Sequence, residues 1–252
     1  MHLSALAFLA GPHLSFPEGF TPSLQLLLRW THFIAGITWV GLLYFFVLVN
    51  APFLKELDAP DRIKVVPLLM PRALWWFRWS SVVTVLAGIW YWMMIVHADA
   101  HNAQTSGGKA IGTFFVIWTA AFAVEMVLLM APSEFLRKGP VFGVAVGITV
   151  LAGAWLYLDL NSHGWESNRL LAIGIGGGLG WFMMLNVWGI VWRAQKKIIR
   201  WSTDASSSQT PMPAEAAHLA GLAQLAARAN FVLSFPMLLM MAVASHYPVL
   251  GP

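Results

Sequence analysis

The 252-residue sequence contains no cysteine and little charge. Charged residues make up 10% of it and hydrophobic residues 58%, whereas soluble domains carry about 25% charged residues. The lack of cysteine excludes thiol nucleophiles, iron–sulfur clusters, thiolate zinc sites and haem attached through a C-x-x-C-H motif. The composition therefore predicts an integral membrane protein in which any redox cofactor is bound noncovalently.

Six apolar stretches are long enough to cross a bilayer, which requires roughly 20 residues for a hydrocarbon core of about 30 Å. Five of them cover residues 24–50, 73–97, 111–131, 141–160 and 170–192, and the sixth ends near Tyr247. The sixth starts with an amphipathic segment, so one long helix is expected over 214–248. The predicted fold is all-α: a polytopic membrane bundle of about six transmembrane helices, forming a single domain over 1–252.

The remaining segments have simple expected roles. Residues 1–23 are predicted to form a cap on the outer surface, residues 24–200 hold five spans, and the Ser-rich segment 201–213 is expected to be a flexible inner linker. Small-residue spacings of the G-x-x-x-G type predict close helix packing. They occur at Gly143/Gly147, Gly174/Gly178 and Gly176/Gly180.

Basic residues fall in alternate connections between the spans. The two basic-poor connections hold only Lys109 and Arg169. The other three are basic and hold Lys55, Arg62, Lys64, Arg72, Arg137, Lys138, Arg193, Lys196, Lys197 and Arg200. By the positive-inside rule these three connections face the cytoplasm and both termini lie outside. The excess of basic residues behind the net charge of +4 is therefore explained by the orientation of the protein in the lipid bilayer, and no nucleic-acid partner is expected.

Histidines gather toward the outer ends of the predicted spans. His32 lies roughly 12 Å inside the first span at 1.5 Å per residue, while His97 and His246 close the second and last spans. A neutral imidazole is a good ligand for haem iron or copper, and two imidazoles from different helices can hold one haem. The alternative is that the outer imidazoles only reach interfacial water, which suits His32 least because it lies deepest.

A second polar set lies nearer the inner side. Arg78 is about one turn inside the second span, and Glu125 and Asn186 lie about a turn and a half from the inner ends of the third and fifth spans. Because isolated charges inside a membrane cost several kcal/mol, an ion pair between Arg78 and Glu125 is predicted from their depth. This polar set has two interpretations. In the functional one it forms a proton path, or a quinone or substrate pocket, with Glu125 and Arg78 as catalytic candidates. In the structural one it only stabilises the packing of the helices.

Several segments resemble the membrane domain of the bacterial membrane-bound urate oxidases, a family with an N-terminal multispan domain and a C-terminal cytochrome c. The first is the run RWTHFIAGITWVG at 29–41, followed by Tyr44-Phe45. The others, in the same order along the chain, are Asn186-Val187-Trp188, Gln195-Lys196-Lys197-Ile198-Ile199, Arg228 with Asn230, Ser234-Phe235-Pro236 and Ser245-His246-Tyr247-Pro248.

The first helix is also similar, more distantly, to the haem-binding protoporphyrinogen oxidases and the copper-resistance membrane proteins. All three resemblances imply that His32 serves a haem or a metal. Two departures from the urate oxidases concern function. Because it lacks cysteine, the sequence is expected to carry no covalent cytochrome c, which implies a separate electron acceptor. In addition, Ala229 stands where a histidine is expected before Asn230.

Together these features predict a cytochrome b-like redox protein of the bacterial inner membrane. A noncovalent haem b would be held by His32 with His246 or His97, which are the same residues that would bind a metal. Electrons would come from a small reduced molecule or a quinol and pass to a periplasmic or membrane cytochrome c or to a respiratory complex. An oxidoreductase activity of the urate oxidase type is a candidate and stays open. The alternatives are a noncatalytic subunit of a respiratory complex and a copper or other metal transporter.

Overall fold

The computed structural model describes residues 16–208 and 210–250, and within them the chain is helical and without strands. Six helical segments are long and apolar enough to cross a membrane. They are Phe20–Glu56, Ala59–Asn102, Gly108–Met130, Gly139–Asn161, Asn168–Ser208 and Glu215–Val243. The prediction of an all-α bundle with six spans is confirmed, and the protein is a multi-pass membrane protein.

Two of these segments change helix type on the way. The first comprises α2 (Phe20–Tyr44), the π-helix η1 (Phe45–Asn50) and α3 (Ala51–Glu56). The fifth comprises α7 (Asn168–Asn186), the π-helix η2 (Val187–Val191) and α8 (Trp192–Ser208). The other four are single helices, namely α4 (Ala59–Asn102), α5 (Gly108–Met130), α6 (Gly139–Asn161) and α9 (Glu215–Val243). Since π-turns are frequent at functional sites, the two interruptions single out the residues around them.

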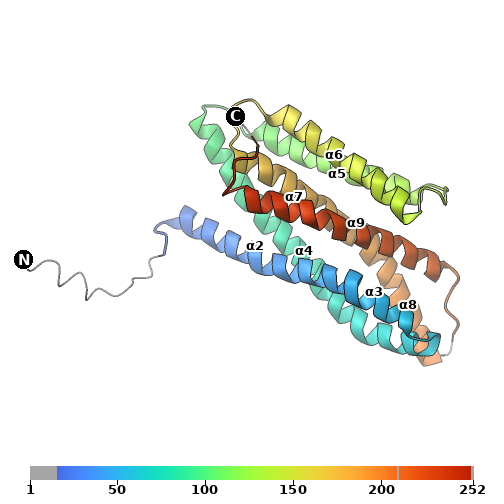
Figure 1. Ribbon diagram of the computed structural model, residues 1–252. Coiled ribbons are helices and arrows are strands. Elements are labelled where there is room, and N and C mark those ends of the chain that lie inside the picture. The colour runs from blue at the N-terminus through green and yellow to red at the C-terminus, as the bar shows by residue number, and fades with distance from the viewer. Residues whose placement is uncertain (1–15, 209, 251–252) are drawn as a thin grey trace, which may run out of the picture.

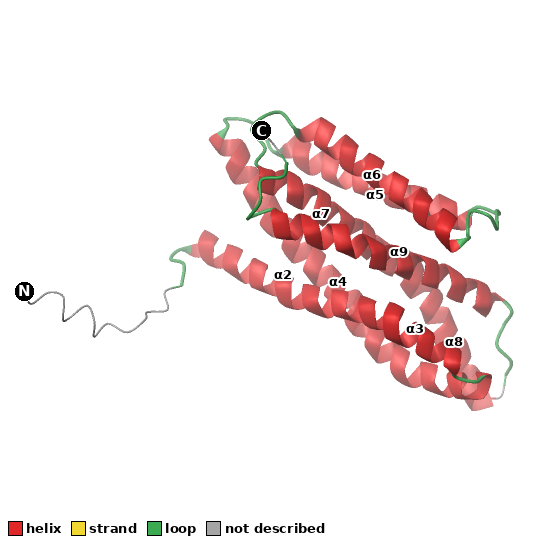
Figure 2. Cartoon of the chain, viewed as in Figure 1, coloured by secondary structure: helices red, strands yellow, loops and turns green. Residues whose placement is uncertain are grey.

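The helices differ in length, which makes the bundle uneven. The 44 residues of α4 span about 66 Å, and the 23 residues of α5 about 35 Å, against a hydrocarbon core of about 30 Å. Figure 1 shows α5 and α6 as a short pair beside the longer helices, while α3, α8 and the first half of α4 continue past them at one end. The loops lie at the two ends of the bundle (Figure 2).

One end of the bundle carries the basic connections and is called here the cationic end. It holds the α3–α4, α5–α6 and α8–α9 connections. The prediction that this end faces the cytoplasm, with both termini outside, stays a prediction.

Helix α7 forms the centre of the bundle and packs against α4, α5, α6 and α9. Its glycines make this possible, because a Cβ atom added at Gly178 would overlap the Trp118 indole and one at Gly174 would overlap the Tyr157 ring. The Trp118 Nε1 also donates a hydrogen bond to the Gly174 carbonyl at 3.2 Å. Close packing at Gly174/Gly178 is therefore confirmed. By contrast, Gly143 and Gly147 have nothing within 4 Å of an added Cβ, so that spacing packs against no described helix.

The structure differs from the predicted boundaries near the Ser-rich segment. Helix α8 continues to Ser208, so most of the expected linker 201–213 is helical and only 210–213 are described as non-helical. Hydroxyl side chains in this stretch donate to backbone carbonyls of the preceding helical turn, as in the hydrogen bond from Thr203 Oγ1 to the Ile199 carbonyl at 2.9 Å. The last helix ends at Val243 rather than at 248. Of the expected outer cap, residues 1–15 lie outside the described residues.

Candidate functional site

His32 lies on the face of α2 that packs against α4. That face is marked by the buried residues Leu28, Ala35, Trp39 and Leu43. The His32 Nδ1 is 2.7 Å from the backbone carbonyl oxygen of Thr84 on α4. A carbonyl can only accept, so Nδ1 carries the proton and donates it. The lone pair of the neutral ring therefore resides on Nε2, which is the arrangement found in histidines that bind a metal through Nε2.

Gly88 provides the space for the imidazole. A Cβ atom at Gly88 would lie 2.6 Å from His32 Nδ1 and 2.7 Å from Cε1, closer than real Cβ contacts permit. Gly88 lies one turn after Thr84 on α4, so these two residues contact one edge of the ring together. Sequence reasoning did not select either of them. The only signal was a glycine inside an apolar span that belongs to no G-x-x-x-G spacing.

The two other predicted ligands lie differently with respect to His32. His97 follows Gly88 by nine residues on α4, which is two and a half turns, so it lies about 13 Å away along the axis and on the opposite side of the helix. The structure therefore does not bring His97 to the imidazole of His32. His97 and His246 are both exposed.

His246 lies level with His32 along the bundle axis. The reference point is the hydrogen bond of 3.0 Å between Tyr44 Oη on α2 and Ser234 Oγ on α9. His32 precedes Tyr44 by twelve residues, and His246 follows Ser234 by twelve residues in the turn after α9. Because α2 and α9 are antiparallel, both histidines are about 18 Å from that hydrogen bond in the same direction.

The predicted ion pair between Arg78 and Glu125 is wrong. The Arg78 guanidinium carbon lies 3.8 Å from the Trp192 ring centroid, and neither Glu125 oxygen has a hydrogen-bond partner among the described residues. The physical reason is the position of α7, which packs between α4 and α5. Arg78 therefore contacts α8, while Glu125 faces α7. Depth alone could not reveal this, because it does not determine the rotation of a helix.

Glu125 belongs to a buried row of polar side chains that crosses the bundle. Glu125 on α5 is 1% exposed, and Asn186 at the end of α7 and Asn230 on α9 are 0% exposed. Asn186 Nδ2 donates to Asn230 Oδ1 at 2.9 Å, and Asn230 Nδ2 donates to the Met183 carbonyl at 3.0 Å. Asn186 is also the polar neighbour of Glu125, although it stays outside hydrogen-bonding geometry with either carboxylate oxygen.

Ser234 and Tyr44 extend this row to α2. Ser234 follows Asn230 by one turn of α9 and is also 0% exposed; its hydroxyl contacts Tyr44 as described above. We call Glu125, Asn186, Asn230, Ser234 and Tyr44 the polar track. The π-helices η1 and η2 begin directly after Tyr44 and Asn186, so both interruptions of the helices occur at the polar track.

The polar track has acceptors without donors. Glu125 Oε1, Glu125 Oε2 and Asn186 Oδ1 are buried and have no hydrogen-bond partner among the described residues. Buried polar atoms in native proteins are nearly always paired. Acceptors of this kind are satisfied by a proton on the carboxyl group or by a bound donor, so this end of the polar track is suited to holding a proton.

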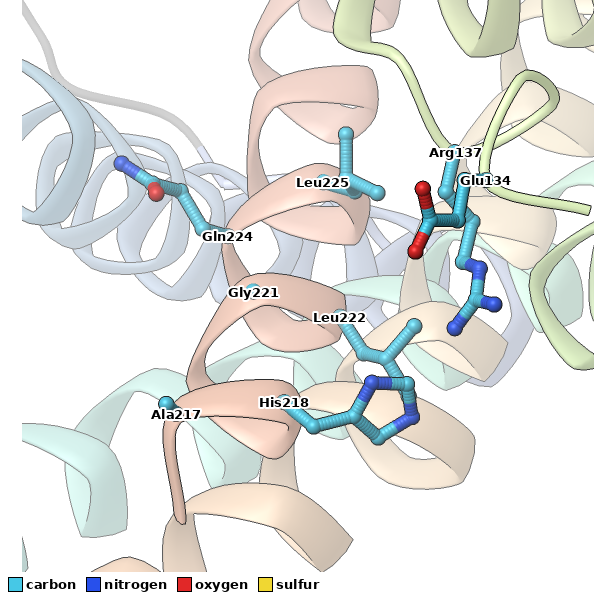
Figure 3. A pocket seen from close by; sticks show the side chains of 8 residues that line it. All are labelled: Glu134, Arg137, Ala217, His218, Gly221, Leu222, Gln224 and Leu225. Atoms are coloured by element: carbon cyan, nitrogen blue, oxygen red, sulfur yellow. The ribbon is translucent and has the colours of Figure 1, made fainter. Parts of the chain in front are cut away.

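An open pocket of about 390 Å³ lies where the α5–α6 connection approaches α9. Figure 3 shows Arg137 extending past Leu222 toward His218, with Glu134 beside Arg137. One imidazole and one carboxylate are fewer ligands than a structural metal site uses. In the described part of the chain, no group of three or more His, Cys, Asp or Glu residues could hold a metal ion. This pocket therefore adds no ligand to those selected above.

Most of the chain matches one known protein family. Residues 57–251 match the family described as urate oxidase N-terminal. The matched range includes Gly88, most of the polar track and His246, whereas His32 and Tyr44 precede it. No curated protein and no solved structure is significantly similar to the chain. Because the match extends from the start of α4 to the end of the described residues, the chain belongs to the urate oxidase N-terminal family.

Proposed function

We propose that this chain is a membrane redox protein that binds haem b noncovalently through His32. The observation that carries the proposal is the 2.7 Å hydrogen bond from His32 Nδ1 to the Thr84 carbonyl. It orients the ring, selects the tautomer and leaves Nε2 available, as required of an axial ligand. Because Gly88 has no Cβ atom, the ring has room to adopt this position.

The second axial ligand in this proposal is His246. The level of His246 along the bundle axis, which matches that of His32, supports the choice. His97 is disfavoured because it lies about 13 Å farther along α4 and on the opposite side of that helix. Haem bound here would supply one-electron redox chemistry. The chain itself would set the properties of the site through the ligand His32, its hydrogen bond to Thr84 and the apolar helices around it.

The electron donor is proposed to be a small reduced molecule or a quinol, and the acceptor a separate cytochrome c or an oxidase complex. Oxidation of such a donor releases protons, and a polar group inside the bundle could accept them. Glu125 supports this role, because both of its oxygens are buried without a partner. Membership of the urate oxidase N-terminal family supports an oxidoreductase, and the cytoplasmic membrane of a bacterium is the proposed location.

A pyridine haemochrome assay on protein purified after haem-replete expression tests the proposal. We expect an alpha band in the wild type, its loss in His32→Ala, and a reduced band in His246→Ala. His97→Ala is the matched control, since it removes an exposed imidazole from the same end of the bundle and should leave the band unchanged. An absent alpha band in the wild type would overturn the proposal. So would equal haem content in His32→Ala and the wild type.

A further inference from the structure

The open pocket of about 390 Å³ beside α9 takes no part in the proposed redox chemistry. Its depth in the bundle follows from the polar track, where Asn186 links Glu125 on α5 to Asn230 on α9. Leu225 lines the pocket and precedes Asn230 by five residues, while Met130, the last residue of α5, follows Glu125 by five residues. Because α5 ends and α9 begins at the cationic end, the pocket starts at the level where α5 ends.

This level is that of the lipid headgroups. The 23 residues of α5 already span the hydrocarbon core of about 30 Å, so the chain beyond Met130 lies in the headgroup layer. Met130 and Phe135, on either side of Glu134 in the chain, are 76% and 61% exposed. An exposed aromatic ring is typical of the membrane interface. A phospholipid whose acyl chains contact this apolar surface would place its headgroup at the pocket.

The pocket holds one carboxylate and one guanidinium group, and neither has an ionic partner in the protein. Glu134 and Arg137 both come from the α5–α6 connection, and Figure 3 shows them beside each other. The ion pairs among the described residues involve neither of them. Two opposite charges at one pocket are therefore available to a ligand that carries both signs of charge.

The facing wall is one side of α9, formed by His218, Gly221, Leu222 and Leu225. Residues spaced by three or four along a helix share a face, so these four lie together. A Cβ atom added at Gly221 meets nothing within 4 Å, and the wall is open at this point. Among the described residues no aromatic side chain of Phe, Tyr or Trp lines the pocket. Quaternary ammonium groups are bound by aromatic cages, so this lining suits a primary ammonium group better.

We infer that this pocket binds the zwitterionic headgroup of phosphatidylethanolamine from the leaflet at the cationic end. Arg137 would bind the phosphate, for which a guanidinium group is well suited, and His218 would donate a hydrogen bond to it. Glu134 would accept hydrogen bonds from the primary ammonium group. The charges of Glu134 and Arg137 sum to zero, as do those of the lipid. His32 lies toward the other end of the bundle, so the inference needs no haem.

Native mass spectrometry of the full chain in detergent tests the inference with three lipids that have the same acyl chains. Phosphatidylethanolamine carries a phosphate and a primary ammonium group, phosphatidylcholine has no N–H donor, and phosphatidylglycerol has no cation. We expect phosphatidylethanolamine to bind about fivefold more tightly than either of the others, since each of them loses one partly exposed charged interaction. Equal affinities for the three lipids would overturn the inference.

A soluble probe distinguishes a membrane lipid from a free headgroup. Glycerophosphoethanolamine has the same phosphate and ammonium groups but no acyl chains. It should bind about tenfold more weakly than phosphatidylethanolamine, because it lacks the apolar contacts of the chains. Equal affinity for the two compounds would overturn the assignment of the pocket to a membrane lipid.

Three variants assign the interactions to residues. Glu134→Gln should abolish the preference for phosphatidylethanolamine over phosphatidylcholine, and Arg137→Gln should weaken all three lipids about fivefold, because all contain the phosphate. Glu56→Gln, a control that removes an exposed carboxylate outside the pocket at the same end of the bundle, should change neither property. A Glu134→Gln protein that keeps the wild-type preference would contradict the inference, and so would a loss of preference in Glu56→Gln.

A fourth variant fills the pocket without removing a charge. Gly221→Leu places a side chain where an added Cβ meets nothing within 4 Å, and leucine favours a helix more than glycine does. The variant should therefore keep or raise the temperature of thermal unfolding without lipid, and bind phosphatidylethanolamine about fivefold more weakly than the wild type. Unchanged binding of phosphatidylethanolamine in Gly221→Leu would contradict the placement of the headgroup in this pocket.

Discussion

His32 on α2 donates a hydrogen bond of 2.7 Å from Nδ1 to the backbone carbonyl of Thr84 on α4. This contact joins the first two spans through a polar interaction inside an apolar interface. It also determines which nitrogen of the imidazole is free, because the protonated nitrogen is engaged. The first span precedes the residues that match the family, so the contact also connects that span to the matched region.

Replacing Gly88 by Ala should disturb this contact. The new Cβ would lie 2.6 Å from His32 Nδ1, so the ring or the helix must move, at a cost of about 1–3 kcal/mol for an overpacked interface. We expect a lower free energy of unfolding and a several-fold lower haem content, measured by absorbance per mole of protein. Gly41→Ala is the control, because an added Cβ there meets nothing within 4 Å. Equal haem content in the two variants would show that Gly88 does not position the ring.

Arg78 and Glu125 should behave independently. The structure places the Arg78 guanidinium over Trp192 and leaves the Glu125 carboxylate without a partner. In a double-mutant cycle of Arg78→Gln and Glu125→Gln, the changes in unfolding free energy should therefore add to within about 0.5 kcal/mol. The measurement is equilibrium unfolding in mixed micelles. A coupling energy clearly above this value would restore the ion pair that depth alone predicts.

Loss of Asn230 should destabilise the bundle more than loss of the Tyr44 hydroxyl. Asn230→Leu leaves the buried Asn186 Nδ2 without its acceptor. It also removes the side-chain donor to the Met183 carbonyl, which keeps the backbone N–H of Val187. Tyr44→Phe instead leaves only the Ser234 hydroxyl, which also donates to the Phe231 carbonyl at 2.7 Å. We expect a loss of about 1–3 kcal/mol for Asn230→Leu and about 0.6 kcal/mol for Tyr44→Phe, measured in the same unfolding assay. The reverse order would contradict the hydrogen-bond pattern of the polar track.

Two glycine spacings of the same type should respond oppositely to alanine. An added Cβ at Gly178 would overlap the Trp118 indole, whereas one at Gly143 meets nothing within 4 Å. Gly178→Ala should therefore reduce the yield of folded protein severely, and Gly143→Ala should keep or raise stability, since alanine favours helix over glycine by about 1 kcal/mol. Size-exclusion chromatography and thermal unfolding of the two variants provide the comparison. A strong loss in Gly143→Ala would indicate a packing partner outside the chain.

The number of spans and the polar residues inside them followed from the sequence alone. Apolar stretches of sufficient length predict membrane helices whatever their rotation, and all six are present. Polar residues are so rare within them that His32, Glu125 and Asn186 stand out without any knowledge of the fold. The interactions of these residues required the tertiary structure. In a helix that is apolar on all sides, periodicity does not identify the face that meets a neighbour.

The physical reason is that contacts depend on helix rotation and on which helices are neighbours. Arg78 and Glu125 share a depth, yet α7 separates them. Conversely, Asn186 and Asn230 meet although they are 44 residues apart. Gly88 shows its importance only when His32 is placed against it. The sequence thus determines which segments enter the membrane and which side chains are costly there, and the packing of α7 among α4, α5 and α9 decides which of those side chains find a partner.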